Sequence, residues 1–322
     1  MNRCKRPLAL LCAACGITAS PAFAQITCST ASMTDLAFGS IDPGSSATSV
    51  NATLSYSCRN TSTSRTYSAR VCFSIGEPGG RQTNPRQMLN GANKLDFQLY
   101  QDPGRSIVWG SSFFGSFLTP YVVTMTLAAR GTINGSQTMY GFVLANQVTA
   151  VPGNYAEIYL AGDTAVTIND AQGNTAPADC DMTNVGSFPF DVTAVISKQC
   201  TVSATTLDFG APAGFLTSNV DGTSTVTTQC SNGTPYQIGF NNGAHASGTT
   251  RRMGGGSSEF ITYELYRDSN RSLRWGGTPN TDTVNGTGNG LAQSNTVYGR
   301  VAPQATPSPS SYSDTITINV TY

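Results

Sequence analysis

Residues 261–268, ITYELYRD, are matched at residues 95–102 by LDFQLYQD. In the later stretch the apolar side chains of Ile261, Tyr263 and Leu265 occupy every second position, and the earlier stretch repeats this arrangement. A period of two is typical of a β-strand with one buried face. Similar alternation recurs at residues 123–127 and 315–322. The sequence therefore predicts strands near both ends and in the middle of the chain.

The repeat extends over most of the chain. A Trp-Gly pair follows ten residues after each motif leucine, at Trp109 and at Trp275. Further landmarks recur in the same order: two cysteines 30 positions apart, a Phe-Gly pair, a Tyr-Gly pair and a late tyrosine (Cys28 and Cys58 with Cys200 and Cys230, Phe38 with Phe209, Tyr140 with Tyr298, Tyr155 with Tyr312). Landmarks repeated in order indicate a duplication. We expect one domain at residues 25–196 and a second at residues 197–322.

The composition supports an all-β fold. Charged residues make up 11% of the 322 residues, against about 25% in an ordinary soluble domain. There are 33 glycines, 18 basic and 18 acidic residues, and strong helix formers are scarce. Short strands separated by Asn-Gly turns, with a cysteine pair spanning two of them, predict two immunoglobulin-like β-sandwich domains in tandem. The low basic content argues against nucleic acid as a partner.

Residues 1–24 have the three regions of a secretory signal peptide. Arg3, Lys5 and Arg6 precede an apolar stretch at residues 8–17, and a small-x-small cleavage site ends at Ala24. We therefore expect export through the inner membrane and removal of this segment. The alternative is a lipoprotein processing site at Cys15, which would give an outer-membrane lipoprotein, although Cys12 stands where such signals normally have leucine.

Six cysteines remain after cleavage, and an even count in an exported chain predicts three disulfides. The connectivity cannot be deduced from the sequence alone. The repeated spacing favours Cys28–Cys58 and Cys200–Cys230, which leaves Cys72–Cys180 in the first domain. None of these cysteines has the close spacing of a zinc site, so we expect no metal.

Catalytic motifs are missing from the sequence. The only histidine, His245, lies in a loop rich in glycine and alanine, and no nucleophile elbow, P-loop, dinucleotide fingerprint or zinc-protease motif accompanies it. We expect a protein that is not an enzyme and needs no cofactor.

The second copy resembles the spore coat protein U domain. The residues that carry the resemblance run in order from Cys200 to the C-terminus (Cys200, Phe209, Gly210, Tyr263, Leu265, Tyr266, Asp268, Trp275, Gly276, Tyr298, Gly299 and residues 312–322). That domain builds Csu-type, or archaic, chaperone–usher pili, and two copies in one exported chain resemble the tip adhesin. The resemblance implies a first domain that binds a target and a second that joins the fibre. It also implies a periplasmic chaperone, an outer-membrane usher and the next pilus subunit as partners, and a cell-surface location.

Subunits of such fibres are incomplete sandwiches completed by a strand from a neighbour. Only Gln25, Ile26 and Thr27 precede Cys28 after cleavage, and three residues span about 10 Å. We therefore expect the chain to accept a strand but not to donate one, as at a tip. The acceptor should be residues 197–322, with an edge at Ile316, Ile318, Val320 and Tyr322 that a chaperone or donor strand contacts. Residues 188–196 offer the first domain a strand of its own.

Apolar loops of the first domain are the candidate surface-binding sites. Phe113, Phe114, Phe117 and Leu118 follow Trp109, where the second copy has no aromatic residue. Val148, Val151 and Pro152 form a second candidate group. An exposed apolar patch marks an interaction site, and the scarcity of lysine favours apolar attachment to an abiotic or host surface. The alternative is that these side chains belong to the core.

Two other functions stay open. The protein would be a secreted spore-coat or matrix component if no fibre is built, and chaperone and usher genes beside its own would argue against this. It would be a sugar-binding adhesin if the first domain holds a polar pocket, and a glycan array would separate that function from binding to apolar surfaces.

Overall fold

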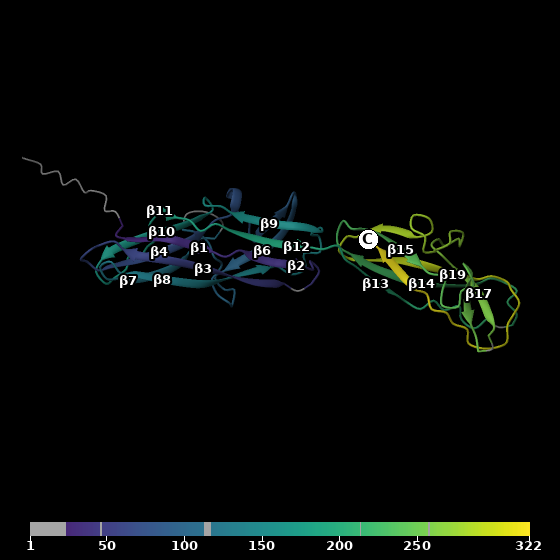
Figure 1. Cartoon of the computed structure of the whole chain (residues 1–322). Helices are drawn as coiled ribbons and strands as arrows, with labels where there is room; N and C mark the ends of the chain where they lie inside the picture. Colours follow the sequence, from purple (N-terminus) through teal and green to yellow (C-terminus); the bar gives the residue numbers. More distant parts are fainter. Residues whose placement is uncertain (1–23, 46, 113–116, 213, 257) are drawn as a thin grey trace, which may run out of the picture.

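The computed structural model describes residues 24–45, 47–112, 117–212, 214–256 and 258–322. The chain is all-β and forms two β-sandwich domains arranged end to end (Figure 1). The predicted fold class is confirmed. The expected signal peptide lies outside the described residues except for Ala24.

The larger sheet of the first domain has eight strands in the order β1-β3-β8-β6-β5-β9-β12-β2. Their bounds are Ile26–Met33 (β1), Thr48–Asn60 (β3), Thr132–Val143 (β8), Asn93–Tyr100 (β6), Arg86–Asn90 (β5), Gly153–Tyr159 (β9), Phe190–Ile196 (β12) and Leu36–Ile41 (β2). The chain therefore enters at one edge with β1 and crosses to the opposite edge with β2.

A four-stranded sheet, ordered β11-β10-β4-β7, packs against the larger one. Its strands are Asn184–Gly186 (β11), Thr164–Gln172 (β10), Tyr67–Ile75 (β4) and Tyr121–Leu127 (β7), and a single 3-10 turn, η1, covers Pro78–Gly80. Alternate residues of both sheets form one hydrophobic core, which is the layered packing expected of a sandwich.

The second domain repeats this plan with fewer strands. Its sheets are ordered β13-β14-β19-β17-β16 and β18-β15-β20. The bounds are Cys200–Ala204 (β13), Val220–Cys230 (β14), Ala292–Val301 (β19), Phe260–Tyr266 (β17), Arg251–Gly254 (β16), Val284–Thr287 (β18), Pro235–Phe240 (β15) and Ile318–Thr321 (β20).

The two tryptophans occupy equivalent positions. The indole Nε1 of Trp109 donates to the carbonyl of Phe73, and that of Trp275 donates to the carbonyl of Ile238, at 2.9 Å in both domains. Both side chains are fully buried. Since a buried indole N–H needs a partner, the repeated bond explains why both copies keep the Trp-Gly landmark at the same distance from the strand motif.

A buried arginine also repeats, and the sequence did not predict it. Arg86 and Arg251 are almost fully buried, and in each domain Nη2 donates to the carbonyl of the tryptophan at 2.8 Å. Burying a guanidinium requires such partners because an unpaired buried charge is costly. These arginines therefore hold the Trp109 and Trp275 segments against the neighbouring strands.

The structure contains the three disulfides that the sequence favours. Cys28–Cys58 joins β1 to β3, and Cys200–Cys230 joins β13 to β14. Cys72–Cys180 ties β4 to the segment between β10 and β11.

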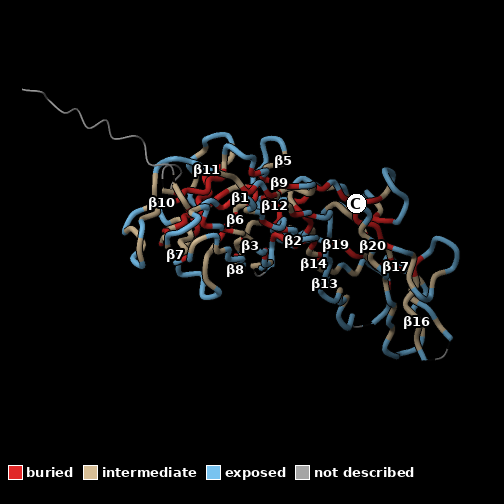
Figure 2. The backbone as a smooth tube through the Cα atoms, turned by 60° about the vertical axis from the view of Figure 1, so that its left-hand side comes forward, coloured by how far each residue is buried: buried red, intermediate tan, exposed pale blue. Residues whose placement is uncertain are grey.

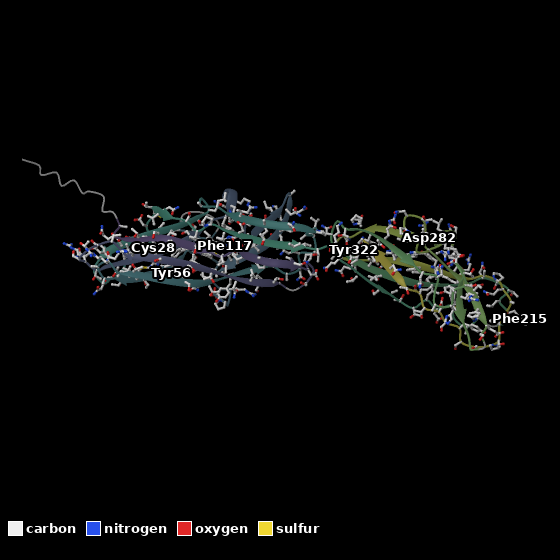
Figure 3. The ribbon with its side chains drawn as sticks, in the orientation of Figure 1. Cys28, Tyr56, Phe117, Phe215, Asp282 and Tyr322 are labelled. Carbon is white, nitrogen blue, oxygen red and sulfur yellow. A yellow bond between two sulfur atoms is a disulfide. The ribbon has the colours of Figure 1, made fainter. Side chains whose placement is uncertain are left out.

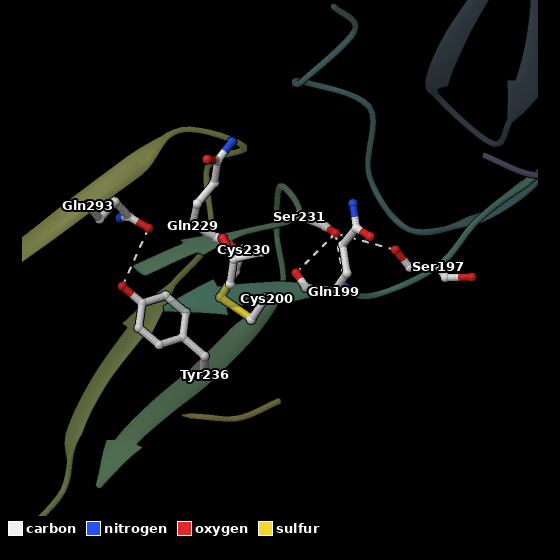
Figure 4. Close-up of a disulfide and its surroundings, with 9 residues drawn as sticks. Ser197, Gln199, Cys200, Gln229, Cys230, Ser231, Tyr236 and Gln293 are labelled. Carbon is white, nitrogen blue, oxygen red and sulfur yellow. Dashed lines mark hydrogen bonds between the residues drawn. A yellow bond between two sulfur atoms is a disulfide. The ribbon is translucent and has the colours of Figure 1, made fainter. Parts of the chain in front are cut away.

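Polar contacts fix residues 197–199, where the second domain begins, against Ser231 of that domain (Figure 4). The hydroxyl of Ser231 accepts from the backbone N–H of Gln199 at 3.1 Å and lies 3.3 Å from the carbonyl of Ser197, to which it donates. The side chain of Asn232 donates to the carbonyl of Thr149 at 2.6 Å. The second domain is therefore bonded directly to a loop of the first.

No helix among the described residues is long and apolar enough to cross a membrane. The same residues hold no cluster of three or more side chains of the types that bind metal ions.

Candidate functional site

Strand β12 completes the first domain. It pairs with β9 in antiparallel fashion, from Phe190 opposite Tyr159 to Ile196 opposite Gly153, and with β2 in parallel fashion, Val192 being opposite Leu36. Its alternate residues Phe190, Val192, Ala194 and Ile196 are buried. The strand closes the gap that would otherwise separate β9 from β2.

Aromatic rings at the start of β12 fill the core around Trp109. The Phe188 ring stacks on the indole at 5.7 Å between centroids, and the Phe190 ring lies 6.4 Å from it. Phe190 also stacks on Tyr159 at 4.4 Å. Burial of one such side chain stabilises a domain by about 1.5–3 kcal/mol, so this strand contributes a large part of the first core.

The second domain has a groove at the equivalent position. Residues 207–211 correspond to β2 and residues 312–316 to β9, and within the described residues no strand lies between them. Cavities of about 840 and 510 Å³ occupy this gap. Leu207, Phe209, Met253 and Tyr312 line both, so the two cavities form one continuous groove, which we call the acceptor groove after the role expected from the sequence.

Side chains beside the groove are less buried than their counterparts. Leu36, Met88 and Leu95 are fully buried in the first domain, whereas the equivalent Leu207, Met253 and Ile261 are half-buried. Phe215 lies at the far end of the second domain (Figure 3). Its side chain is 82% exposed. Buried segments run along the whole first domain and become sparse toward that end of the second (Figure 2). The second core is open where the first is closed.

Polar bonds hold the 312–316 side of the acceptor groove in place. The buried carboxylate of Asp314 accepts from the Tyr263 hydroxyl at 2.7 Å and from the His245 backbone N–H at 3.1 Å. Burial, together with the Asp314 carboxylate, raises the pKa of Tyr263 above its ordinary value. The tyrosine therefore stays protonated and keeps donating.

The equivalent acid of the first domain, Glu157, pairs with Arg81. Burial raises the pKa of Glu157, and the Arg81 bond opposes that rise. Glu157 and Asp314 therefore stabilise the fold, Glu157 at β9 and Asp314 at the equivalent residues 312–316 of the second domain.

The predicted C-terminal edge is divided between two environments. Ile316 and Ile318 line the acceptor groove. Val320 packs on the second core from β20, which pairs only with β15 among the described strands, and Tyr322 is more than half exposed.

The loop after Trp109 holds its predicted residues in different settings. Phe113 and Phe114 lie outside the described residues. Phe117 is half-buried, with its ring centroid 4.8 Å from the guanidinium carbon of Arg86, whereas Leu118 is 72% exposed. Figure 3 places Phe117 partway along the first domain, away from its free end.

Val148, Val151 and Pro152, the second predicted binding group, lie in a loop that contacts the second domain. A Cβ on Gly290 would lie 2.1 Å from the carbonyl oxygen of Val148, and one on Gly233 would lie 3.6 Å from Cγ1 of Val151. Because their loop packs against the second domain and is bonded by Asn232, Val148 and Val151 are contacts between the domains, and half-buried Pro152 adjoins them.

Of the residues that line the acceptor groove, the sequence predicted Ile316 and Ile318 at its edge but not Leu207, Met253 or the other lining residues. Phe209 was recognised as a landmark, but a landmark shared by two copies does not show that one copy lacks a strand. The available signal was the apolar run at residues 188–196, which follows the landmarks of the first copy and offers that copy an additional strand.

The model of the Spore Coat Protein U domain matches residues 13–161 and 187–319. The chain belongs to this family and contains the domain twice, as the resemblance predicted. No curated protein matches the sequence significantly.

Several solved structures have a similar arrangement. One is a chain of the CsuC–CsuE chaperone–tip adhesion subunit complex from archaic chaperone–usher Csu pili of Acinetobacter baumannii, at 14% identity and a TM-score of 0.49, covering 91% of this chain and all of that chain. Another is the CupB6 tip adhesin of Pseudomonas aeruginosa, at 10% identity and a TM-score of 0.37, covering 87% of this chain and 88% of that chain.

Proposed function

We propose that the protein is a non-enzymatic adhesin at the tip of a chaperone–usher pilus. Its second domain accepts a strand from the next subunit, and its first domain attaches the pilus to a surface. Membership of the Spore Coat Protein U family and the open core of the second domain support this proposal.

The observation that carries the proposal is the position of β12 in the chain. The second family match begins at residue 187, so β12 is the N-terminal arm of the second copy. This arm is inserted into the first copy, between β9 and β2. The chain thus contains one completed domain and one domain whose corresponding groove needs an equivalent arm from another chain.

The geometry of β12 predicts how the missing strand lies. It should run parallel to residues 207–211 and antiparallel to residues 312–316, with apolar side chains at alternate positions. Strand addition of this kind supplies backbone hydrogen bonds, and the side-chain pockets supply specificity. A periplasmic chaperone would cover the same groove before an usher exchanges it for the next subunit.

A peptide with the sequence of residues 187–196 tests this proposal. Val192 is opposite Leu36, whose equivalent is Leu207. We therefore expect a peptide carrying Val192→Cys to form a disulfide with full-length Leu207→Cys at least tenfold faster than with Asp208→Cys, whose side chain points to the other face. At a hundredfold excess over Kd, the unmodified peptide should stabilise the second domain by about 2.7 kcal/mol.

A peptide with Val192→Asp and Ala194→Asp is the control and should neither bind nor stabilise. Equal cross-linking at residues 207 and 208, or equal binding of both peptides, would contradict the proposed acceptor groove.

We further propose that the loop containing Phe113, Phe114, Phe117 and Leu118 contributes to attachment to apolar surfaces. The exposure of Leu118 supports this. The Phe117 ring supports the loop through its contact with Arg86.

A further inference from the structure

The end of the first domain opposite the second is formed by two loops and the strands beside them. Strand β3 ends there and β4 begins, and β7 ends where β8 begins. Figure 1 shows β4, β7 and β8 reaching this end, while β2 and β12 lie toward the second domain. We call residues 59–66 and 128–132 the distal pole.

Three exposed arginines, Arg59, Arg65 and Arg130, lie on the distal pole. Among the described residues none of them forms a salt bridge. No acid occurs in the sequence between Asp42 and Glu77 or between Asp102 and Glu157, so β3, β4, β7, β8 and the pole itself contain none. The pole is therefore positive in a protein whose total charge is balanced.

The acids packed nearest come from the neighbouring β10 and the segment after it. The Asp170 carboxylate accepts from the backbone N–H of Ile26 at 2.6 Å and keeps its negative charge, which the three arginines of the pole outnumber. Asp179 and Asp181 flank Cys180, whose disulfide holds them over β4 rather than at the pole. Arg70, half-buried on β4, adds a fourth positive charge behind the loops.

A single buried side chain fixes the two loops relative to each other. The side-chain Nδ2 of Asn60 donates to the carbonyls of Arg65 at 2.9 Å and Ala128 at 3.0 Å. The backbone N–H of Asn60 donates to the carbonyl of Gly131 at 2.9 Å. The backbone N–H of Arg130 donates to Ser62 at 3.0 Å. The arginines therefore start from a preorganised backbone, which lowers the entropic cost of binding.

We infer that the distal pole binds an acidic polysaccharide through these three arginines. A guanidinium donates two parallel hydrogen bonds to a carboxylate, and arginines on two loops suit a polymer with repeated carboxylates better than a single anion. The loop between them is Thr61-Ser62-Thr63-Ser64, whose hydroxyls can bond sugar hydroxyls. The pole segments contain no aromatic ring for stacking on bases and no large apolar side chain for insertion into lipid. This inference rests on the proposed function only in taking the first domain as the attaching end.

Binding of the full exported chain to immobilised alginate, a polyuronate, tests the inference against neutral dextran. We expect Arg59→Ser combined with Arg65→Gln and Arg130→Asn to weaken alginate binding at least tenfold. Asparagine is chosen at position 130 because the backbone there has φ of 60°, which asparagine tolerates. Binding of the unchanged chain should weaken as salt rises, since salt screens charges.

The control combines Lys94→Ser, Arg105→Asn and Lys198→Ser, which removes three exposed positive charges elsewhere and again places asparagine where φ is positive, 58° at residue 105. It should leave alginate binding within twofold. Equal loss in both triple variants, or alginate binding no tighter than dextran binding, would overturn the inference. Tighter binding to duplex DNA or to phosphatidylglycerol vesicles than to alginate would also overturn it. The peptide cross-link at Leu207 should be unchanged in the triple arginine variant, so a failed cross-link counts against the acceptor groove and leaves the polysaccharide site standing.

Discussion

Asp102 and Asp268 occupy equivalent positions in the two domains, and their carboxylates make the same hydrogen bonds. The Asp102 carboxylate accepts from the backbone N–H of Ile107 at 2.8 Å and of Ser106 at 3.0 Å. Asp268 makes the same bonds five and four residues on, at 2.7 and 3.0 Å. Each aspartate thus stabilises the turn that leads into the tryptophan segment. This structural role explains why both copies of the strand motif end in aspartate.

The bonded carboxylate predicts a pH dependence. The backbone N–H of Ile107, followed by that of Ser106, holds the pKa of Asp102 below its ordinary value of 3.8. A depressed pKa in the folded state stabilises the fold above the ordinary pKa, and this stabilisation is lost as the pH falls through the folded pKa. We therefore expect Asp102→Asn to lower the Tm of the first domain at pH 7 and to have a smaller effect below about pH 3.

Thermal unfolding of both proteins from pH 7 to pH 2 measures this difference. Asp179→Asn is the control, because within the described residues its carboxylate accepts no hydrogen bond. A Tm difference for Asp102→Asn that stays constant across this range would argue against the carboxylate bonds as its cause.

At the scale of elements, the sequence pattern predicts the structure of the strands better than that of the loops. The alternation at residues 190–196 gives β12 its two faces, and the strand forms as the sequence indicates. The loop at residues 110–120 has no such periodicity. Among its described residues, the carbonyl of Gly110 accepts from the backbone N–H of Ile75 on β4 at 3.0 Å. The exposure of Phe117 and Leu118 therefore depends on contacts with distant strands and cannot be read from a local pattern.

Substitutions should distinguish the role of Leu118 from that of Phe117. We expect Leu118→Ser to reduce adsorption of the protein to polystyrene several-fold with an unchanged Tm, because the side chain is already largely in water. Phe117→Ser should lower the Tm as well, because it removes a half-buried ring from Arg86.

Leu160→Ser is the matched control, since Leu160 is similarly exposed in the turn between β9 and β10. Equal loss of adsorption for Leu118→Ser and Leu160→Ser would show that the loop has no special part in attachment.

At the scale of the whole molecule, the junction fixes how the first and second domains are connected. Gly290 has φ of 79°, and a Cβ there would lie 2.1 Å from the carbonyl oxygen of Val148. Only glycine permits both this backbone conformation and this approach. The loop at residues 148–152, which the sequence suggested for surface binding, is thus used to connect the two domains.

Gly290→Ala should loosen this connection. We expect a larger maximum dimension or a broader distribution of distances in small-angle X-ray scattering, because the Val148 carbonyl must move away. Gly248→Ala is the control, since Gly248 has φ of 60° with nothing within 4 Å of a Cβ. Identical scattering from the Gly290→Ala and unchanged proteins would contradict a junction that depends on this contact.

The sequence by itself determined the β-strand pattern, the duplication, the favoured cysteine pairs and the family. Each of these is encoded locally or by spacing, because alternation places side chains on two faces and repeated landmarks mark equivalent positions. The tertiary structure decided which strand fills which gap, that Val148 and Val151 face the second domain, and that Arg59, Arg65 and Arg130 gather at one end. The low content of charged residues argued against electrostatic attachment. Composition gives only an average over the surface, however, and does not show that folding gathers three arginines at one end. Strand partners and surface patches come from residues far apart in the chain, and only packing brings them together.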